Sequence, residues 1–194
     1  MEACFFKNYE KGDCYGYVAI KRHTFFHICH AVGKWTAETA DEFVGRMKSR
    51  LDIPTHKYRL KIFSDGNYQY NTALLKHFRE DTIDYGQLLK FKENGKLVNK
   101  VKVKVYGNPS YDDIETICIE SYNSVLRNSI SRLVRRTKSF SKKRAMLDLA
   151  LEFHQTYNNF IKKYHNETPA MREGIAKGQW SWKDIFYAKL TFIN

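Results

Sequence analysis

The sequence has few of the residues that mark fibrous, disulfide-rich or membrane-spanning proteins. Among its 194 residues are 3 prolines and 10 glycines, which excludes collagen-like and proline-rich classes. It has no run of 18 or more apolar residues, so no segment is predicted to cross a membrane. The first residues lack the basic and apolar regions of a secretory signal.

Cysteine is also scarce and is not arranged for a zinc ribbon. The four cysteines, Cys4, Cys14, Cys29 and Cys118, include no Cys-x-x-Cys pair. Without an export signal, reduced thiols and a cytoplasmic location are the expectation.

Positive charge and aromatic residues are abundant. Lysine and arginine number 33 against 21 acidic residues, which gives a formal net charge of +12, and aromatic residues make up 15% of the chain. The spread of apolar residues excludes long disordered tails. The charge predicts a polyanionic partner, and nucleic acid is favoured over a membrane surface because no basic amphipathic end or lipidation motif occurs. The alternative is a basic protein whose lysines only keep it soluble.

The first half of the sequence alternates between strand and helix patterns. Three aromatic and β-branched runs with short polar links predict an antiparallel meander. Thr36 and Thr39 open a helical pattern, and the apolar residues that follow recur at helical spacing. The predicted order is β-β-β-α-β-α-β, over residues 4–7, 14–22, 24–32, 36–51, 57–64, 67–78 and 82–91. This order predicts an α/β fold with a mixed sheet and helices packed on it.

The second half is polar at first and then largely helical. Residues 92–113 are rich in lysine and contain VKVKVYG, which predicts a surface hairpin or an inserted loop. Helical spacing resumes after residue 114, and Thr168-Pro169 begins a tail with Trp180 and Trp182. We therefore expect a core over residues 1–167 and a C-terminal helical tail over 168–194.

Asp65 is the first candidate for chemistry. It follows the β-run RLKIFS and precedes Gly66. A carboxylate at the carboxyl end of a strand projects into the crevice where α/β sheets bind ligands. The alternative is an ordinary Asp-Gly turn that ends a strand.

Glu120 is the second candidate, because it is a lone acid in a basic stretch. From Glu120 to Arg144 there are eight lysines or arginines and one acid. On a helix, Glu120, Asn123, Arg127 and Ser131 share one face, which Arg135 extends. Glu120 is therefore either an ion-pair partner of Arg127 or a metal ligand.

The basic stretch itself has the composition of a phosphate-binding segment. Its cations are Arg132, Arg135, Arg136, Lys138, Lys142, Lys143 and Arg144, with Ser139 and Ser141 as further donors. The alternative is a solvated basic face. If Asp65 and Glu120 meet, their hard oxygens suit Mg²⁺ or Mn²⁺, the ions that phosphodiester chemistry commonly uses in pairs.

Histidines and a cysteine form a third group. In a regular strand His23, His27 and Cys29 lie on one face, and His30 points away. This group either holds a metal or forms the rim of a partly buried aromatic strand.

Several segments, in order along the chain, resemble transposases of the insertion-sequence-one type. These are FSDGNYQY (63–70), IESYNSVLR (119–127) and RLVRRTKSFSK (132–142). Four more resemble the same family, so that the resemblance covers nearly the whole chain: DCYGYVAIKR (13–22), GKWTAETADEF (33–43), FHQTYNNFI (153–161) and TPAM (168–171).

The resemblance implies a ribonuclease-H-like catalytic core with a DDE triad. Asp65 corresponds to its second aspartate and Glu120 to its glutamate, with Asn123 and Arg127 in the glutamate's signature. The family's first aspartate opens the first strand as part of an Asp-Glu pair, where this sequence has Met1-Glu2. The expectation is an N-terminally truncated chain without the family's N-terminal DNA-binding segment, in which Glu2 or Asp13 is left as the first carboxylate.

The activity that the resemblance implies is cleavage and strand transfer of insertion-sequence DNA with Mg²⁺ or Mn²⁺. The partners would be transposon ends and target DNA, bound by a homodimer or a higher synaptic assembly. The DNA-binding residues would be Asn123, Arg127, Arg132, Arg135, Arg136, Lys138, Lys142 and Lys143. Two alternatives stay open: a catalytically incomplete DNA-binding remnant of such a transposase, and an RNA-binding or structural protein.

Overall fold

The strands form two three-stranded sheets with different connectivity. The computed structural model describes residues 2–6, 14–134, 138–139 and 141–187, with the backbone alone for residues 2–6. In the first sheet, β1 (Glu2–Phe6), β2 (Cys14–Ile20) and β3 (His27–Gly33) are antiparallel in the order β1-β2-β3. The predicted meander is therefore confirmed.

The second sheet is mixed. Strand β4 (Leu60–Asp65) pairs in parallel with β5 (Ile83–Glu93), and β5 pairs antiparallel with β6 (Lys96–Tyr106). Helix α2 (Gln69–His77) and a short 3-10 helix (Glu80–Thr82) connect β4 to β5. The β5–β6 turn is Asn94-Gly95, both with positive φ, which suits the right-handed twist of a hairpin. Segment 92–113 thus holds the end of β5, this turn and β6.

Helix α1 (Ala37–Lys48) begins as the sequence predicts. The Thr36 hydroxyl accepts a hydrogen bond from the Thr39 amide at 3.5 Å, which caps the helix. Helix α1 connects the first sheet to β4, so the predicted order of strands and helices is confirmed.

One helix of the second half is shorter than its sequence pattern suggests. Helix α3 (Ile117–Ser129) ends before the 3-10 helix Ser131–Leu133, so the expected helical row stops short of Ser131. Helix α4 (Arg144–Thr156) continues into a π-helical turn, Tyr157–Ile161. The tail contains α5 (Pro169–Arg172) and α6 (Trp182–Tyr187), and Trp182 stacks on Phe153 of α4 at 4.6 Å.

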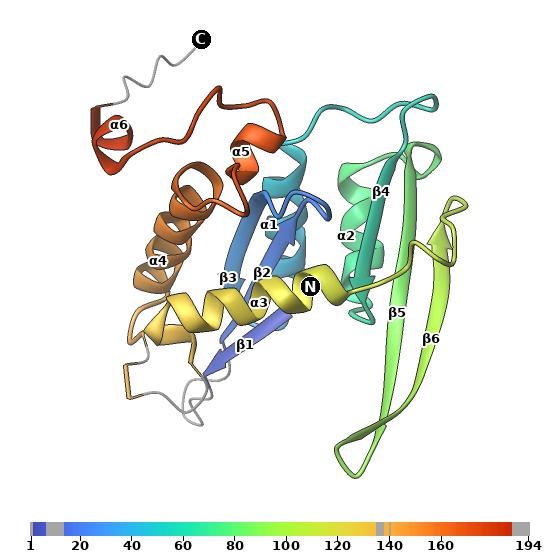
Figure 1. Cartoon of the computed structure of the whole chain (residues 1–194). Helices are drawn as coiled ribbons and strands as arrows, with labels where there is room; N and C mark the ends of the chain where they lie inside the picture. Colours follow the sequence, from blue (N-terminus) through green and yellow to red (C-terminus); the bar gives the residue numbers. More distant parts are fainter. Residues whose placement is uncertain (1, 7–13, 135–137, 140, 188–194) are drawn as a thin grey trace.

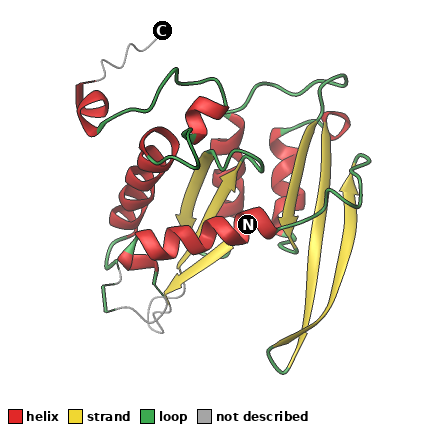
Figure 2. Cartoon of the chain, viewed as in Figure 1, coloured by secondary structure: helices red, strands yellow, loops and turns green. Residues whose placement is uncertain are grey.

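Helices cover both faces of the strands (Figures 1 and 2). On one face, α1 and α2 bury a cluster that joins the sheets, with Tyr17 and Cys29 from the first and Tyr85 from the second. On the other face, Tyr122 and Leu126 of α3 and Leu151 of α4 pack against β2 and β3. The molecule is a mixed α/β fold. Among the described residues, no helix has the length and apolar character needed to span a bilayer.

Candidate functional site

Asp65 lies at the carboxyl end of β4 and faces away from α2. Its neighbour Ser64 is buried and hydrogen-bonds the Tyr85 hydroxyl at 2.7 Å, within the core beneath α1 and α2. Because successive residues of a strand face opposite sides, Asp65 points to the other face. The Asn67 amide donates to its carboxylate at 3.4 Å, which orders the turn at Gly66.

Glu120 lies in the first turn of α3, where the helix dipole favours a carboxylate. The Thr116 hydroxyl donates to the Glu120 carboxylate at 2.6 Å. Lys90 of β5 donates to the same carboxylate oxygen and, at 3.1 Å, to the Thr116 hydroxyl. The ion-pair partner seen for Glu120 is thus a lysine from the sheet.

Asp65 and Glu120 approach the same face of the second sheet. Asp65 is paired in register with Leu88, and paired residues in a sheet point to the same side. Lys90 is two residues beyond Leu88, so it shares that side and meets Glu120 there. In Figure 1, the start of α3 and the carboxyl end of β4 lie in the same part of the view, beside the beginning of β1.

The electrostatics of this site favour an ionised Glu120. Burial acts to raise the pKa of Glu120, but the hydrogen bonds from Lys90 and Thr116 and the charges of Lys90 and Lys100 outweigh it, so the pKa lies below its usual value. The carboxylate is therefore charged at neutral pH and has a cationic group in contact.

A row of lysines continues from the site along β6, in a segment whose sequence predicts only a surface hairpin or an inserted loop. Lys100 pairs in register with Lys90, Lys102 with Leu88, and Lys104 with Gly86, so all three are on the Asp65 side. Lys102 ion-pairs with Glu115 at 2.7 Å, and Lys104 bonds Asn108 at 2.7 Å. The alternation in VKVKVYG is the pattern that identifies such a one-sided row.

The residues expected to bind DNA divide into buried, half-buried and exposed positions. Asn123 is 6% exposed, so little of it is open to phosphate, whereas Arg127 is half-buried. Arg132 is also half-buried and donates to the Ser141 hydroxyl at 3.3 Å. Exposed positions are Lys138, Lys142 and Lys143, whereas Arg135 and Arg136 lie outside the described residues.

The predicted facing of the histidines is wrong. Ala19 pairs with Cys29 but Ile20 pairs with His27, so Ile28 is an extra residue that forms a β-bulge. The bulge turns His27 towards α3, where its ring meets the Tyr122 hydroxyl at 3.1 Å, and next to the His30 ring. Cys29 faces α1 instead, where burial raises the pKa of its thiol to about 12.

No group of three metal-ligating side chains that includes Asp65 or Glu120 is found among the described residues. Glu2 opens β1, opposite Tyr17 of β2, and only its backbone is described, while Asp13 lies outside the described residues. The one cluster of three metal-ligating side chains found in the described part of the chain is elsewhere, at His30, Asp148 and Glu152.

The carboxylates of Asp65 and Glu120 are the type of ligand that a hard divalent cation prefers. Asp65 and Glu120 supply carboxylate oxygens, and the Lys90 ammonium against Glu120 shows that a positive charge is accommodated there.

No family model matches the chain, and neither the curated proteins nor the solved structures compared with it include a significant match.

Proposed function

We propose that the chain is the catalytic core of a DDE transposase of the insertion-sequence-one type, with a ribonuclease-H-like fold. The observation that carries the proposal is the convergence of Asp65, from the end of β4, and Glu120, from the first turn of α3, on one face of the sheet. An antiparallel meander, a helix and then two parallel strands joined by a helix is the order that the proposal requires.

The substrate in this proposal is DNA, which transposon ends and target both supply. The face that carries Asp65 also carries the lysines of β6, which would contact phosphates and give salt-dependent affinity. Exposed Lys142 and Lys143 would extend the phosphate contacts, and Asn123 would position α3 from within the core.

In the proposed reaction, Asp65 and Glu120 would hold Mg²⁺ or Mn²⁺, which activates the attacking hydroxyl or water and stabilises the leaving oxygen when bound. Thr116 keeps the Glu120 carboxylate oriented through its 2.6 Å hydrogen bond. Lys90 holds that carboxylate ionised and supplies positive charge next to the phosphates. Two such chains in a synaptic assembly would join two DNA ends.

The test is cleavage and joining of a DNA duplex that carries the terminal repeats flanking its own gene. With Mg²⁺, Asp65→Asn and Glu120→Gln are each expected to reduce nicking by about 10³-fold or more, because each removes an oxygen ligand from the reacting centre. The matched control is Glu93→Gln, which removes an exposed carboxylate at the far end of β5. Wild-type nicking that persists in Asp65→Asn contradicts the proposal.

A second function, DNA binding without cleavage, is favoured by one observation. Glu120 already has a lysine partner, and among the described residues neither Asp65 nor Glu120 belongs to a cluster of three metal-ligating side chains. Under this alternative the wild-type chain binds duplex DNA with a steep salt dependence and leaves the duplex uncut at every Mg²⁺ and Mn²⁺ concentration. A preference for RNA in competition would favour an RNA-binding protein.

A further inference from the structure

A second polar cluster lies at the edge of the first sheet, where α4 packs on β3. Asp148 and Glu152 are four residues apart on α4 and so share one helix face. His30 of β3 completes the cluster, and one ligand atom from each of the three residues lies within 4.8 Å of the others. This group is independent of Asp65 and Glu120.

The buried imidazole of His30 is the feature that the protein alone does not explain. His30 is 2% exposed, and neither of its ring nitrogens has a hydrogen-bond partner among the described residues. Its Nε2 is 3.5 Å from Oδ1 of Asp148, and this oxygen also lacks a hydrogen-bond partner in the described part of the chain. Buried polar atoms normally have a partner, so an atom is expected between the two.

The nearby arginines do not supply the missing partner of His30 and Asp148. Arg46 is 3.6 Å from Oδ1 of Asp148, and its shorter bonds go to Glu42 at 2.8 Å and to the His30 carbonyl at 3.1 Å. Arg144 also binds Glu42, at 2.9 Å. The arginines are therefore directed mainly at Glu42.

A comparison with His154 shows why unpartnered ring nitrogens alone do not indicate a metal site. His154 is also buried with neither ring nitrogen hydrogen-bonded to a described residue, but its ring lies among the rings of Tyr122 and Tyr157. Among the described residues, His154 belongs to no cluster of three metal-ligating side chains. His30 differs because one of its ring nitrogens lies within 4.8 Å of a carboxylate oxygen of both Asp148 and Glu152.

We propose that His30, Asp148 and Glu152 bind a divalent transition-metal ion of the Zn²⁺ class. One imidazole nitrogen and two carboxylate oxygens form a borderline donor set, which Zn²⁺ and Co²⁺ prefer more than Mg²⁺ does. Ligand atoms on a tetrahedral ion lie roughly 3.3 Å apart, given bonds of about 2.0–2.1 Å, so the His30–Asp148 spacing is already suitable. The Glu152 side chain is exposed and has the rotamer freedom to close the remaining gap.

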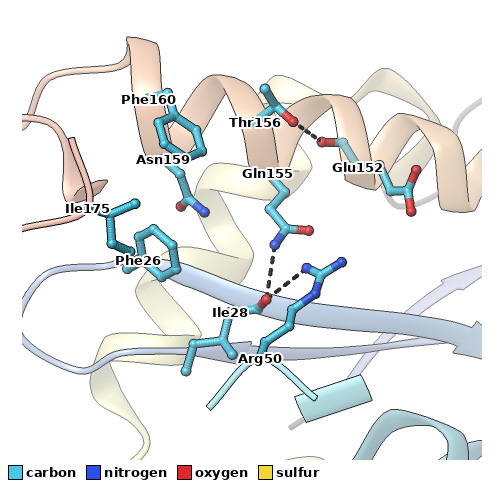
Figure 3. Close-up of a pocket in the computed structure, with 9 residues that line it drawn as sticks. All are labelled: Phe26, Ile28, Arg50, Glu152, Gln155, Thr156, Asn159, Phe160 and Ile175. Atoms are coloured by element: carbon cyan, nitrogen blue, oxygen red, sulfur yellow. Dashed lines mark hydrogen bonds between the residues drawn. The ribbon is translucent and has the colours of Figure 1, made fainter. Parts of the chain in front are cut away.

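The site lies beside a hollow of about 560 Å³ between β3 and α4 (Figure 3). Glu152 is at one end of the hollow, and Phe160 and Ile175 are at the other. Arg50 and Gln155 both donate to the Ile28 carbonyl on its floor, at 2.9 and 3.0 Å. With three protein ligands, the fourth position on the ion is left to water or to an anionic group that enters from this hollow.

The neutral form of His30 that a metal needs is available at physiological pH. Burial is the main reason that the pKa of His30 falls to about 4, and the charges of Arg46 and Arg50 act in the same direction against that of Asp148. The ion would also tie α4 to the edge strand β3, so metal binding would stabilise the folded chain.

The experiment is a Co²⁺ titration of the tag-free, metal-free full chain, followed by its visible absorption and by Zn²⁺ competition. We expect one tight site per chain, with affinity at least about tenfold weaker in Glu152→Gln and weaker still in Asp148→Asn. Exposed Glu93→Gln is the matched control and is expected to bind like the wild type. Loss of the tight site in Asp65→Asn would place the ion at the other site and overturn the proposal.

Unchanged affinity in both Glu152→Gln and Asp148→Asn would overturn the proposal. So would an intense near-ultraviolet thiolate band, because it would place the ion on cysteine. Glu152→Gln changes an exposed side chain, so its folding, checked by circular dichroism, is expected to be intact. The readout is binding and not DNA cleavage, so this result and the test of the DNA site are separable.

Discussion

The two acidic clusters differ in the charges and the burial that surround them. Glu120 is exposed and in contact with a lysine, and further lysines on the same face extend away along β6. Asp148 is half-buried beside a fully buried histidine and an arginine whose shorter bonds go elsewhere. Under the two proposals, a carboxylate would therefore bind a hard cation beside phosphates in one place and a borderline metal in the other.

The surroundings also predict different responses to solution conditions. The face of α3 and α4 that covers the first sheet buries His27 and His154. The face of the second sheet that carries Asp65 instead carries lysines that are half-buried or exposed. Buried neutral histidines make stability depend on pH, and exposed lysines make ligand affinity depend on salt. Each response is a way to test the contrast.

The largest expected effect is loss of stability in acid. Burial lowers the pKa of His154 to about 4 and that of His27 well below its usual value. A histidine with a depressed folded pKa binds its proton more readily when unfolded, so stability falls as pH decreases from the unfolded pKa of about 6.5 towards 4. Between pH 7 and 5 the expected loss from His154 is roughly 2 kcal/mol, and His27 adds a further loss in the same direction.

Urea unfolding at pH 7, 6 and 5 measures this loss. The variant His154→Gln is expected to be less stable at pH 7 but to show a shallower pH dependence, because one titrating group is removed. His23→Gln, at an exposed histidine outside these buried rings, is the matched control. A stability that does not change between pH 7 and 5 contradicts the burial of neutral imidazoles.

An intermediate effect is expected for DNA affinity when the β6 row is neutralised. The triple variant Lys100→Gln, Lys102→Gln, Lys104→Gln is expected to bind duplex DNA about 10- to 100-fold more weakly, and its plot of log affinity against log salt becomes shallower by up to about 2.7. Fluorescence anisotropy at several salt concentrations measures both quantities.

The matched control removes three exposed lysines elsewhere, in Lys48→Gln, Lys163→Gln, Lys177→Gln. The two variants have the same net charge, so a difference between them reports position and not overall charge. Equal losses of affinity in both would mean that DNA contacts no particular face, and the assignment of β6 to the interface would fail.

Local patterns were sufficient to predict the elements and the position of Asp65. An apolar β-run that ends at Asp-Gly predicts a carboxylate at the end of a strand, and Asp65 is the last residue of β4. The Thr36 cap and the alternation of apolar residues likewise depend on neighbours in the sequence. Such features are set within a few residues, so they can be read without the fold.

Features that depend on distant contacts could not be predicted in the same way. The Lys90–Glu120 pair requires α3 to cross the end of β5, and nothing around Glu120 in the sequence indicates it. The Ile28 bulge breaks the strict alternation on which the histidine prediction relied. Asp148 and Glu152 are visible as a helical pair, but His30 joins them only because α4 packs on β3.

The smallest expected effect concerns the pKa of Glu120 and tests its contact with Lys90. In Lys90→Gln the carboxylate loses a hydrogen bond and the nearest positive charge, so the pKa of Glu120 is expected to rise. Because a lowered carboxyl pKa contributes stability that is lost as pH falls through it, the variant also loses a small part of its stability above that pH. Side-chain carbon NMR of a chain labelled at glutamate follows the titration.

Lys92→Gln, which changes an exposed lysine on the same strand, should leave the Glu120 titration unchanged. If the two variants titrate alike, Lys90 does not hold Glu120, and the first cluster loses the feature that separates it from the second.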